Sequence, residues 1–219
     1  WIQFYCDSNQ DVADTTLLAF RLAEDPRILL PVMVCMDAFI VSHTSLETAL
    51  ATQADVDRFL PDCDIPHHLD SEHPSATGAL AWPQETVSQR MDLHEAILRV
   101  PEVLEEHREG FRSVFGRTVS PPVEGWFLDD AEEILIASGT ISITALEVVR
   151  SLRAQGRKVG LIRIKLFRPF PAEEIARLCR GVDRIGVLDR NYAAGAGGIF
   201  CQEVRSALQG QSQAVVQSY

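Results

Sequence analysis

Three polar residues that could serve a reaction follow one apolar run near the start of the chain. The run from Ile28 to Met36 predicts a buried strand, and Asp37, Ser42 and His43 come after it. Open α/β sheets place their ligand sites at the carboxyl ends of strands. These residues are therefore candidates to line or brace a cleft. Alternatively, Ser42 or Thr44 caps the next segment and His43 makes a structural hydrogen bond.

Glycines at the start of a predicted helix over residues 199–208 form a second candidate site. Gly195, Gly197 and Gly198 would let a phosphate approach backbone N–H groups. The dinucleotide fingerprint needs another glycine at the position of Phe200, and it belongs to the first strand–helix turn. We therefore favour a tight turn that permits close packing over a nucleotide site.

Three basic residues, Arg163, Lys165 and Arg168, alternate along and after a predicted strand. They could face an anionic ligand. We favour a solvated or partner-facing edge, because most charged side chains remain in water.

Metal sites are not indicated by the spacing of the histidines and cysteines. His67, His68 and His73 occupy a loop without a partner at helical spacing. No Cys-x-x-Cys pair occurs among the five cysteines, which predicts buried, reduced thiols in a cytoplasmic protein. We assign no catalytic residue and no metal ligand.

The elements that would position these residues are clearest in the second half of the chain. Apolar runs at residues 134–137, 159–162 and 185–188 show no in–out alternation, which predicts parallel strands covered on both faces. Helical spacing lies between the runs, and a fourth strand begins near Ala214. Together these elements predict a βαβαβ unit of an α/β fold.

The first half is less regular. A strand over residues 2–6, a helix over 12–24 and the 28–36 strand form a βαβ unit that is too small to fold alone. We expect its missing neighbours upstream of Trp1, in an excised or incomplete polypeptide. Residues 44–83 show no periodic apolar face and predict a segment that wraps over another surface.

A strongly helical composition covers residues 85–115. Pro101 interrupts it and predicts either a kink or a new helix start, because proline breaks the backbone hydrogen-bond ladder.

Charge and composition exclude some classes of function. The net charge of −11 is uneven: the residues before Trp126 carry 8 Lys and Arg against 21 Asp and Glu, and the later residues carry 12 against 10. Nucleic acid binding requires a basic surface, and a membrane span requires an apolar run near 20 residues. Neither occurs, so we expect neither partner.

Two stretches carry a resemblance to one family. The run RILLPVMVCMDAFIVSH, from Arg27 to His43, resembles the end of the first domain of the pyruvate:ferredoxin oxidoreductases. The order ILIASG, GRKVGLIRIKLFRPFP and VLDRNYAAGAGG resembles their second domain, of the transketolase C-terminal type. Family members carry glycine where this chain has Ala38, so a loop that needs a positive φ would be shifted here.

The resemblance implies three parts: residues 1–45 as the end of a thiamine diphosphate pyrimidine-binding domain, residues 46–125 as an extended and helical linker, and residues 126–219 as a transketolase C-terminal-like domain with a truncated last strand. It implies an alpha subunit of a 2-oxoacid:ferredoxin oxidoreductase, acting on pyruvate. Coenzyme A would accept the acyl group, and ferredoxin or flavodoxin the electrons.

The cofactors implied for the complete enzyme are thiamine diphosphate with Mg²⁺ and [4Fe–4S] clusters. Other subunits or domains of an oligomer would hold them, so this fragment would mainly support assembly and be inactive alone. Two alternatives stay open. One is the beta subunit of a thiamine-dependent 2-oxoacid dehydrogenase, which would need lipoamide and NAD; the other is a non-catalytic interaction module.

Overall fold

The N-terminal elements form a mixed three-stranded sheet in the computed structural model, which describes residues 1–63, 69–75, 78 and 80–219. Strand β1 (Ile2–Tyr5) runs parallel to β2 (Val32–Cys35) and antiparallel to β6 (Leu166–Arg168). Helix α1 (Asn9–Ala23) connects β1 to β2 and buries Leu18 against this sheet. The neighbour of β1 is thus a strand from more than 150 residues later in the chain, which the local pattern did not predict.

The second sheet has five strands in the order β10-β7-β4-β5-β3. The four parallel strands are β4 (Glu133–Ala137), β5 (Val159–Ile164), β7 (Arg184–Val187) and β10 (Val215–Ser218). Strand β3 (Val123–Trp126) adds an antiparallel edge that the sequence pattern did not predict. The predicted parallel strands are therefore confirmed, and the α/β class with them.

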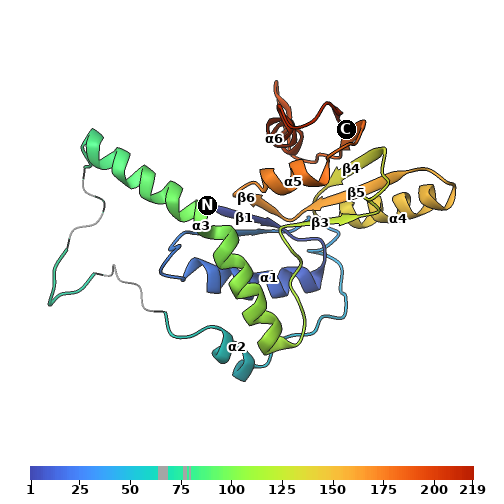
Figure 1. Cartoon of the computed structure of the whole chain (residues 1–219). Coiled ribbons are helices and arrows are strands. Elements are labelled where there is room, and N and C mark those ends of the chain that lie inside the picture. The colour runs from blue at the N-terminus through green and yellow to red at the C-terminus, as the bar shows by residue number, and fades with distance from the viewer. Residues whose placement is uncertain (64–68, 76–77, 79) are drawn as a thin grey trace.

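Helices cover both faces of this sheet, which is why its strands lack alternation. Helix α4 (Ile141–Ala154) packs Val149 on one face. Helices α5 (Ala172–Leu178) and α6 (Ile199–Leu208) pack Ile175 and Val204 on the other face. Figure 1 shows α5 and α6 above the strands and α1 below the first sheet.

The glycine cluster forms a tight turn, as predicted. Strands β8 (Tyr192–Ala193) and β9 (Gly197–Gly198) pair antiparallel, and Gly195 and Gly197 have φ angles of 82° and 94°. A Cβ on Gly198 would lie 2.5 Å from Asp189 Oδ2, so close packing requires glycine there. The same Asp189 oxygen accepts the N–H of Cys201 at 3.1 Å, in the first turn of α6.

The middle of the chain contains more structure than its sequence indicated. Helix α2 (Gln53–Phe59) forms inside the segment predicted to lack a periodic face. Thr52 caps it by accepting the Asp55 N–H at 3.2 Å, and Phe59 packs edge-on against Phe111. The prediction was wrong because a seven-residue helix with one buried anchor carries little periodicity. His67 and His68 lie outside the described residues.

Helix α3 (Pro83–Phe115) is continuous through Pro101. It changes direction near its middle (Figure 1), so the kink is the correct one of the two predicted alternatives. The strand predicted over residues 28–36 is shorter than expected, because Ile28 N–H bonds to Asp25 O at 2.8 Å in a turn before β2.

No helix in the described part of the chain combines the length and apolar character needed to cross a membrane.

Candidate functional site

The two sheets meet at the carboxyl ends of their parallel strands. A cavity of about 220 Å³ lies at this junction. Its lining comes from the ends of β1 and β2, from the turn after β4 and from the turn after β7: Tyr5, Cys6, Cys35, Met36, Asp37, Ala38, Gly139, Arg190 and Asn191. This is the place at which α/β sheets bind ligands.

Asp37 is the central side chain of the junction. Its Oδ2 accepts the backbone N–H of Thr140 at 2.8 Å and also the Thr140 hydroxyl. Its Oδ1 accepts from Arg190 Nη1 at 2.8 Å. Asp37 therefore places a negative charge at the N-terminus of α4, where the helix dipole stabilises it, and ties the first sheet to the second.

Gly139 makes this approach possible. Its φ of 60° suits glycine, and a Cβ there would lie 3.3 Å from Asp37 Oδ2. A larger residue would crowd the carboxylate as well as strain the turn.

Ser42 and His43 lie in the exposed part of the same loop and line neither this cavity nor the neighbouring one of about 460 Å³. Ser42 Oγ accepts the Phe39 N–H at 3.0 Å and lies 2.7 Å from His43 Nδ1, while the Phe39 and His43 rings lie 4.9 Å apart. The structure thus brings Asp37 into the junction and leaves Ser42 and His43 bracing the loop. The positive φ of this loop, 67°, falls on Phe39 and not on Ala38.

Several junction residues were missed from the sequence. Tyr5 Oη accepts from Asn191 Nδ2 at 2.9 Å, and burial is the main cause that raises the pKa of Tyr5. Arg190 and Asn191 lie two and three residues after the third predicted strand, so the rule that selected Asp37 would also have found them.

The three basic residues are paired with carboxylates inside the chain. The prediction of a solvated or partner-facing edge was wrong for Arg163 and Lys165, whose side chains are largely buried, whereas Arg168 stays partly exposed. Lys165 is 2% exposed and its Nζ lies 2.5 Å from Asp11 Oδ1. Arg163 pairs with Asp7 and, at 2.5 Å, with Glu124. They are buried because β6 pairs with β1 and brings this segment against α1.

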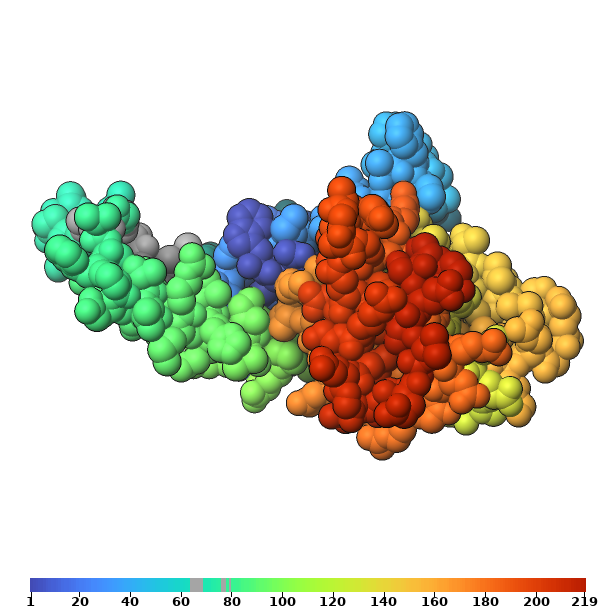
Figure 2. All heavy atoms as spheres, turned by 90° about the horizontal axis from the view of Figure 1, so that it is seen from above, coloured from blue at the N-terminus to red at the C-terminus, as the bar shows by residue number. Residues whose placement is uncertain are grey.

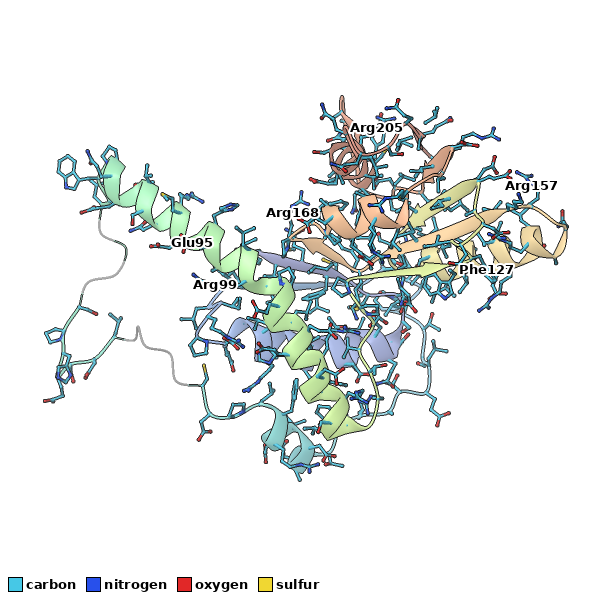
Figure 3. The ribbon with its side chains drawn as sticks, viewed as in Figure 1. Glu95, Arg99, Phe127, Arg157, Arg168 and Arg205 are labelled. Atoms are coloured by element: carbon cyan, nitrogen blue, oxygen red, sulfur yellow. The ribbon has the colours of Figure 1, made fainter. Side chains whose placement is uncertain are left out.

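Burial also sets the proton affinities of this cluster. It lowers the pKa of the Arg163 guanidinium and raises the pKa of the Glu124 carboxyl, since both lose solvation of their charged forms. Arg168, the third basic residue, is labelled in Figure 3. It pairs with Glu203 at 2.5 Å, and its guanidinium carbon lies 4.0 Å from the centroid of the Phe167 ring.

The buried thiols are poor ligands and nucleophiles. Burial raises the pKa of Cys6 and of Cys179 to about 12, which keeps both protonated near neutral pH. Both side chains pack in apolar or ion-paired surroundings, at 1% and 0% exposure.

The carboxylate of Asp37 is engaged by hydrogen bonds within the junction. Both Asp37 oxygens already accept from Thr140 and Arg190. Within the residues that the structure describes, no group of three or more His, Cys, Asp or Glu side chains is placed to hold a metal ion.

The fold and junction define a class: an α/β protein in which two sheets meet at the carboxyl ends of their strands. Family models identify it further. Residues 1–109 match the thiamine diphosphate-binding domain of pyruvate flavodoxin/ferredoxin oxidoreductase, and residues 131–219 match the pyruvate:ferredoxin oxidoreductase core domain II. The chain belongs to the pyruvate:ferredoxin oxidoreductase family.

Named relatives agree with this assignment. The chain is 37% identical over 209 residues to the pyruvate synthase subunit PorA of Methanothermobacter thermautotrophicus, covering 95% of this chain and 54% of that protein. It is 39% identical over 209 residues to the ketoisovalerate oxidoreductase subunit VorA of Pyrococcus abyssi, covering 95% and 52%. The chain therefore spans about half the length of these relatives.

A solved structure shows the same fold. The 2-oxoglutarate:ferredoxin oxidoreductase from Magnetococcus marinus, with 2-oxoglutarate, coenzyme A and succinyl-CoA bound, superposes with a TM-score of 0.58 at 14% identity. The match covers 100% of this chain and 38% of that one.

Proposed function

We propose that this chain is part of the alpha subunit of a thiamine diphosphate-dependent 2-oxoacid:ferredoxin oxidoreductase acting on pyruvate. The reaction is oxidative decarboxylation: the 2-oxoacid and coenzyme A give acyl-CoA and CO₂, and two electrons pass to ferredoxin or flavodoxin. The observation that carries the proposal is that both ends of the chain match, in order, two domains of one family. The pyruvate synthase relatives favour pyruvate, and the ketoisovalerate relative makes a branched 2-oxoacid the next substrate to test.

The chain's own role in this proposal is to support and position. Asp37 braces the junction through Thr140 and Arg190, while Ser42 and His43 hold the exposed part of the same loop. Thiamine diphosphate supplies the carbanion chemistry when bound. We assign its Mg²⁺, the iron–sulfur clusters and the coenzyme A site to other domains or subunits, and we assign no catalytic residue or metal ligand to this chain.

The assembly and its setting are part of the same proposal. The relatives are named as subunits, which supports an oligomer with further chains that hold the pyrophosphate, coenzyme A and clusters. The buried thiols suit the reducing cytoplasm. The division into residues 1–45, 46–125 and 126–219 remains a proposal as well.

The test uses the full-length protein with its partner subunits. A low-potential acceptor, viologen or ferredoxin, should be reduced when pyruvate and coenzyme A are added together. Omission of coenzyme A should suppress turnover. Reduction of NAD through lipoamide, with no viologen reduction, would instead identify a 2-oxoacid dehydrogenase. An enzyme that reduces none of these acceptors with any 2-oxoacid would overturn the proposal.

A further inference from the structure

The cavity of about 220 Å³ at the junction is bounded on one side by polar side chains from distant parts of the chain. Tyr5 ends β1, and Arg190 and Asn191 lie in the turn after β7. Figure 2 shows the light-blue loop after β2 beside the orange segment after β7, and the hydrogen bond from Arg190 to Asp37 joins them. Hydrogen-bonding groups of both sheets therefore converge on one cavity.

Arg190 has donors to spare in this cavity. Its Nη1 bonds Asp37 Oδ1 at 2.8 Å, and its side chain is 51% exposed. A guanidinium carries five N–H donors. Among residues 1–63, 69–75, 78 and 80–219, no second side chain accepts from Arg190. Asp37 does not depend on Arg190 alone, because Thr140 also donates its N–H at 2.8 Å. Arg190 is therefore available to a second acceptor.

Another arginine of this protein shows that one guanidinium can hold two carboxylates. Arg27 Nη2 lies 2.8 Å from Asp25 Oδ2 and 2.7 Å from Glu106 Oε2. The planar, multi-donor head of arginine suits such bridging. A ligand carboxylate at Arg190, with Asp37 on the other side, would repeat this arrangement.

Tyr5 supplies a second donor in a fixed place. Its Oη accepts from Asn191 Nδ2 at 2.9 Å, so the hydroxyl proton remains to be donated. Burial is the main cause that raises the pKa of Tyr5, which keeps this proton on the oxygen near neutral pH. Edge-on contacts hold the ring, with centroids 5.9 Å from Phe167 and 5.1 Å from Phe200.

The rest of the cavity is largely apolar, and the cavity is small. Cys35, Met36 and Ala38 line it at and after the end of β2. Burial raises the pKa of the Cys35 thiol, so this wall stays uncharged. Pockets for drug-sized ligands span roughly 300–1,000 Å³, and a nucleotide or diphosphate cofactor needs at least as much room. The cavity therefore suits a short molecule with an acceptor head and an apolar tail.

We propose that the junction cavity binds a short aliphatic carboxylate of about two to five carbons, held at its oxygens by Arg190 and Tyr5. Its tail would lie against Cys35, Met36 and Ala38. Such a ligand would bridge β1 and the turn after β7, which belong to different sheets. The 2-oxoacid of the proposed reaction and an unreactive carboxylate share this chemistry. The site rests on the cavity and its donors and not on the proposed reaction, so either can fail without the other.

Isothermal titration of the full-length protein with isobutyrate tests the site. Isobutyramide has the same shape without the charge and should bind roughly tenfold more weakly, because its bonds to Arg190 are not charge-assisted on both sides. Arg190→Gln should weaken isobutyrate binding roughly tenfold or more for the same reason. Tyr5→Phe keeps the ring, removes one neutral donor and should weaken binding by about three- to tenfold.

The matched control is Arg180→Gln, which removes the same charge at an exposed position after α5 and should bind isobutyrate like the parent. Because Arg190 also bonds Asp37, urea unfolding checks that its variant folds, while Tyr5→Phe tests the site without removing a partner of Asp37.

Three results would overturn the proposal: no isobutyrate binding by the parent, equal binding of isobutyramide, or unchanged affinity in both Arg190→Gln and Tyr5→Phe. Competition then identifies the source of the ligand. Displacement of isobutyrate by pyruvate, without coenzyme A or an electron acceptor, would show that the 2-oxoacid occupies the cavity. Isobutyrate binding that pyruvate does not displace would identify an unreactive carboxylate as the occupant. Both results support the carboxylate site.

Discussion

Lys165 and Asp11 form a buried ion pair across 154 residues of sequence, with Nζ 2.5 Å from Oδ1. The lysine lies between β5 and β6, and the aspartate lies in the first turn of α1. Asp11 also accepts the Asp7 N–H at 3.2 Å and the Thr15 hydroxyl at 3.3 Å. These two donors lie just before α1 and within it. The pair therefore fixes the position of α1 relative to the segment that joins β5 to β6.

Removal of one member of this pair should be strongly destabilising. Lys165→Met leaves the Asp11 carboxylate buried without its cation, and we expect a loss of about 3–5 kcal/mol in the free energy of unfolding. The double variant Lys165→Met with Asp11→Leu should recover most of that loss, since no unpaired charge remains. Urea unfolding of the parent and variants measures this. A single variant that costs less than about 1 kcal/mol would show that the pair is not desolvated.

The acid stability of the protein should depend on Asp25 and His107. The Arg27 hydrogen bond is the main cause that holds the pKa of Asp25 below its usual range, and burial is the main cause that lowers the pKa of His107. His107 Nε2 lies 2.9 Å from Asp25 Oδ2, and both side chains are buried.

The lowered pKa values of Asp25 and His107 change the stability of the fold in the same direction as pH varies. The unfolded chain binds protons more readily than the folded one at each group, so the stabilisation is complete at high pH and falls as pH decreases. For His107 the loss begins below about pH 6.5, and for Asp25 below about pH 4. Unfolding free energy measured from pH 7 to 4 should therefore fall with acid, and His107→Gln should flatten the slope below about pH 6.5. His94→Gln, at an exposed position of α3, is the control and should change the unfolding free energy at pH 7 by less than about 0.5 kcal/mol.

Asp37 should position the junction. Asp37→Asn keeps the shape but weakens the charge-assisted bonds from Thr140 and Arg190. If the proposed activity holds, kcat/KM of the assembled enzyme should fall roughly 10- to 100-fold, because small displacements of bracing residues misplace reacting groups.

The control for that loss is Asp57→Asn, which changes an exposed carboxylate of α2 that bonds Gln53. Its kcat/KM should match the parent. A purely structural role of Asp37 would lower the fraction of folded enzyme with unchanged kcat and KM per folded molecule, so titration of active sites separates the two roles.

Gly198 should not tolerate a side chain. The methyl group of Gly198→Ala would meet Asp189 at 2.5–2.8 Å and displace the carboxylate that accepts the Cys201 N–H. We expect a loss of about 1–3 kcal/mol in unfolding free energy. Gly110→Ala is the matched control: its Cβ would meet Phe59 at 3.9 Å, an ordinary contact inside a helix, and should stabilise by about 0.5–1 kcal/mol. Thermal unfolding of both variants distinguishes a steric effect from a general cost of replacing glycine.

Much of the second sheet was predictable because its signals are local. Residues 134–137, 159–162 and 185–188 became parallel strands since each run must be covered on both faces. Strands β3 and β6 were missed because an antiparallel edge and a three-residue strand depend on which partner is nearby. Helix α2 was missed because Phe59 is its one buried residue.

The amino-acid sequence by itself determined the α/β class, the family and the position of Asp37 at a strand end, since apolar runs, turn residues and family signatures are read along the chain. Tertiary structure decided what Asp37 and the basic residues contact. The bonds from Asp37 to Thr140 and Arg190 and from Lys165 to Asp11 join residues 103, 153 and 154 positions apart. Whether a charge is solvated or buried depends on the neighbour that arrives from elsewhere in the chain, and for Lys165 that neighbour is α1, brought there by the pairing of β6 with β1.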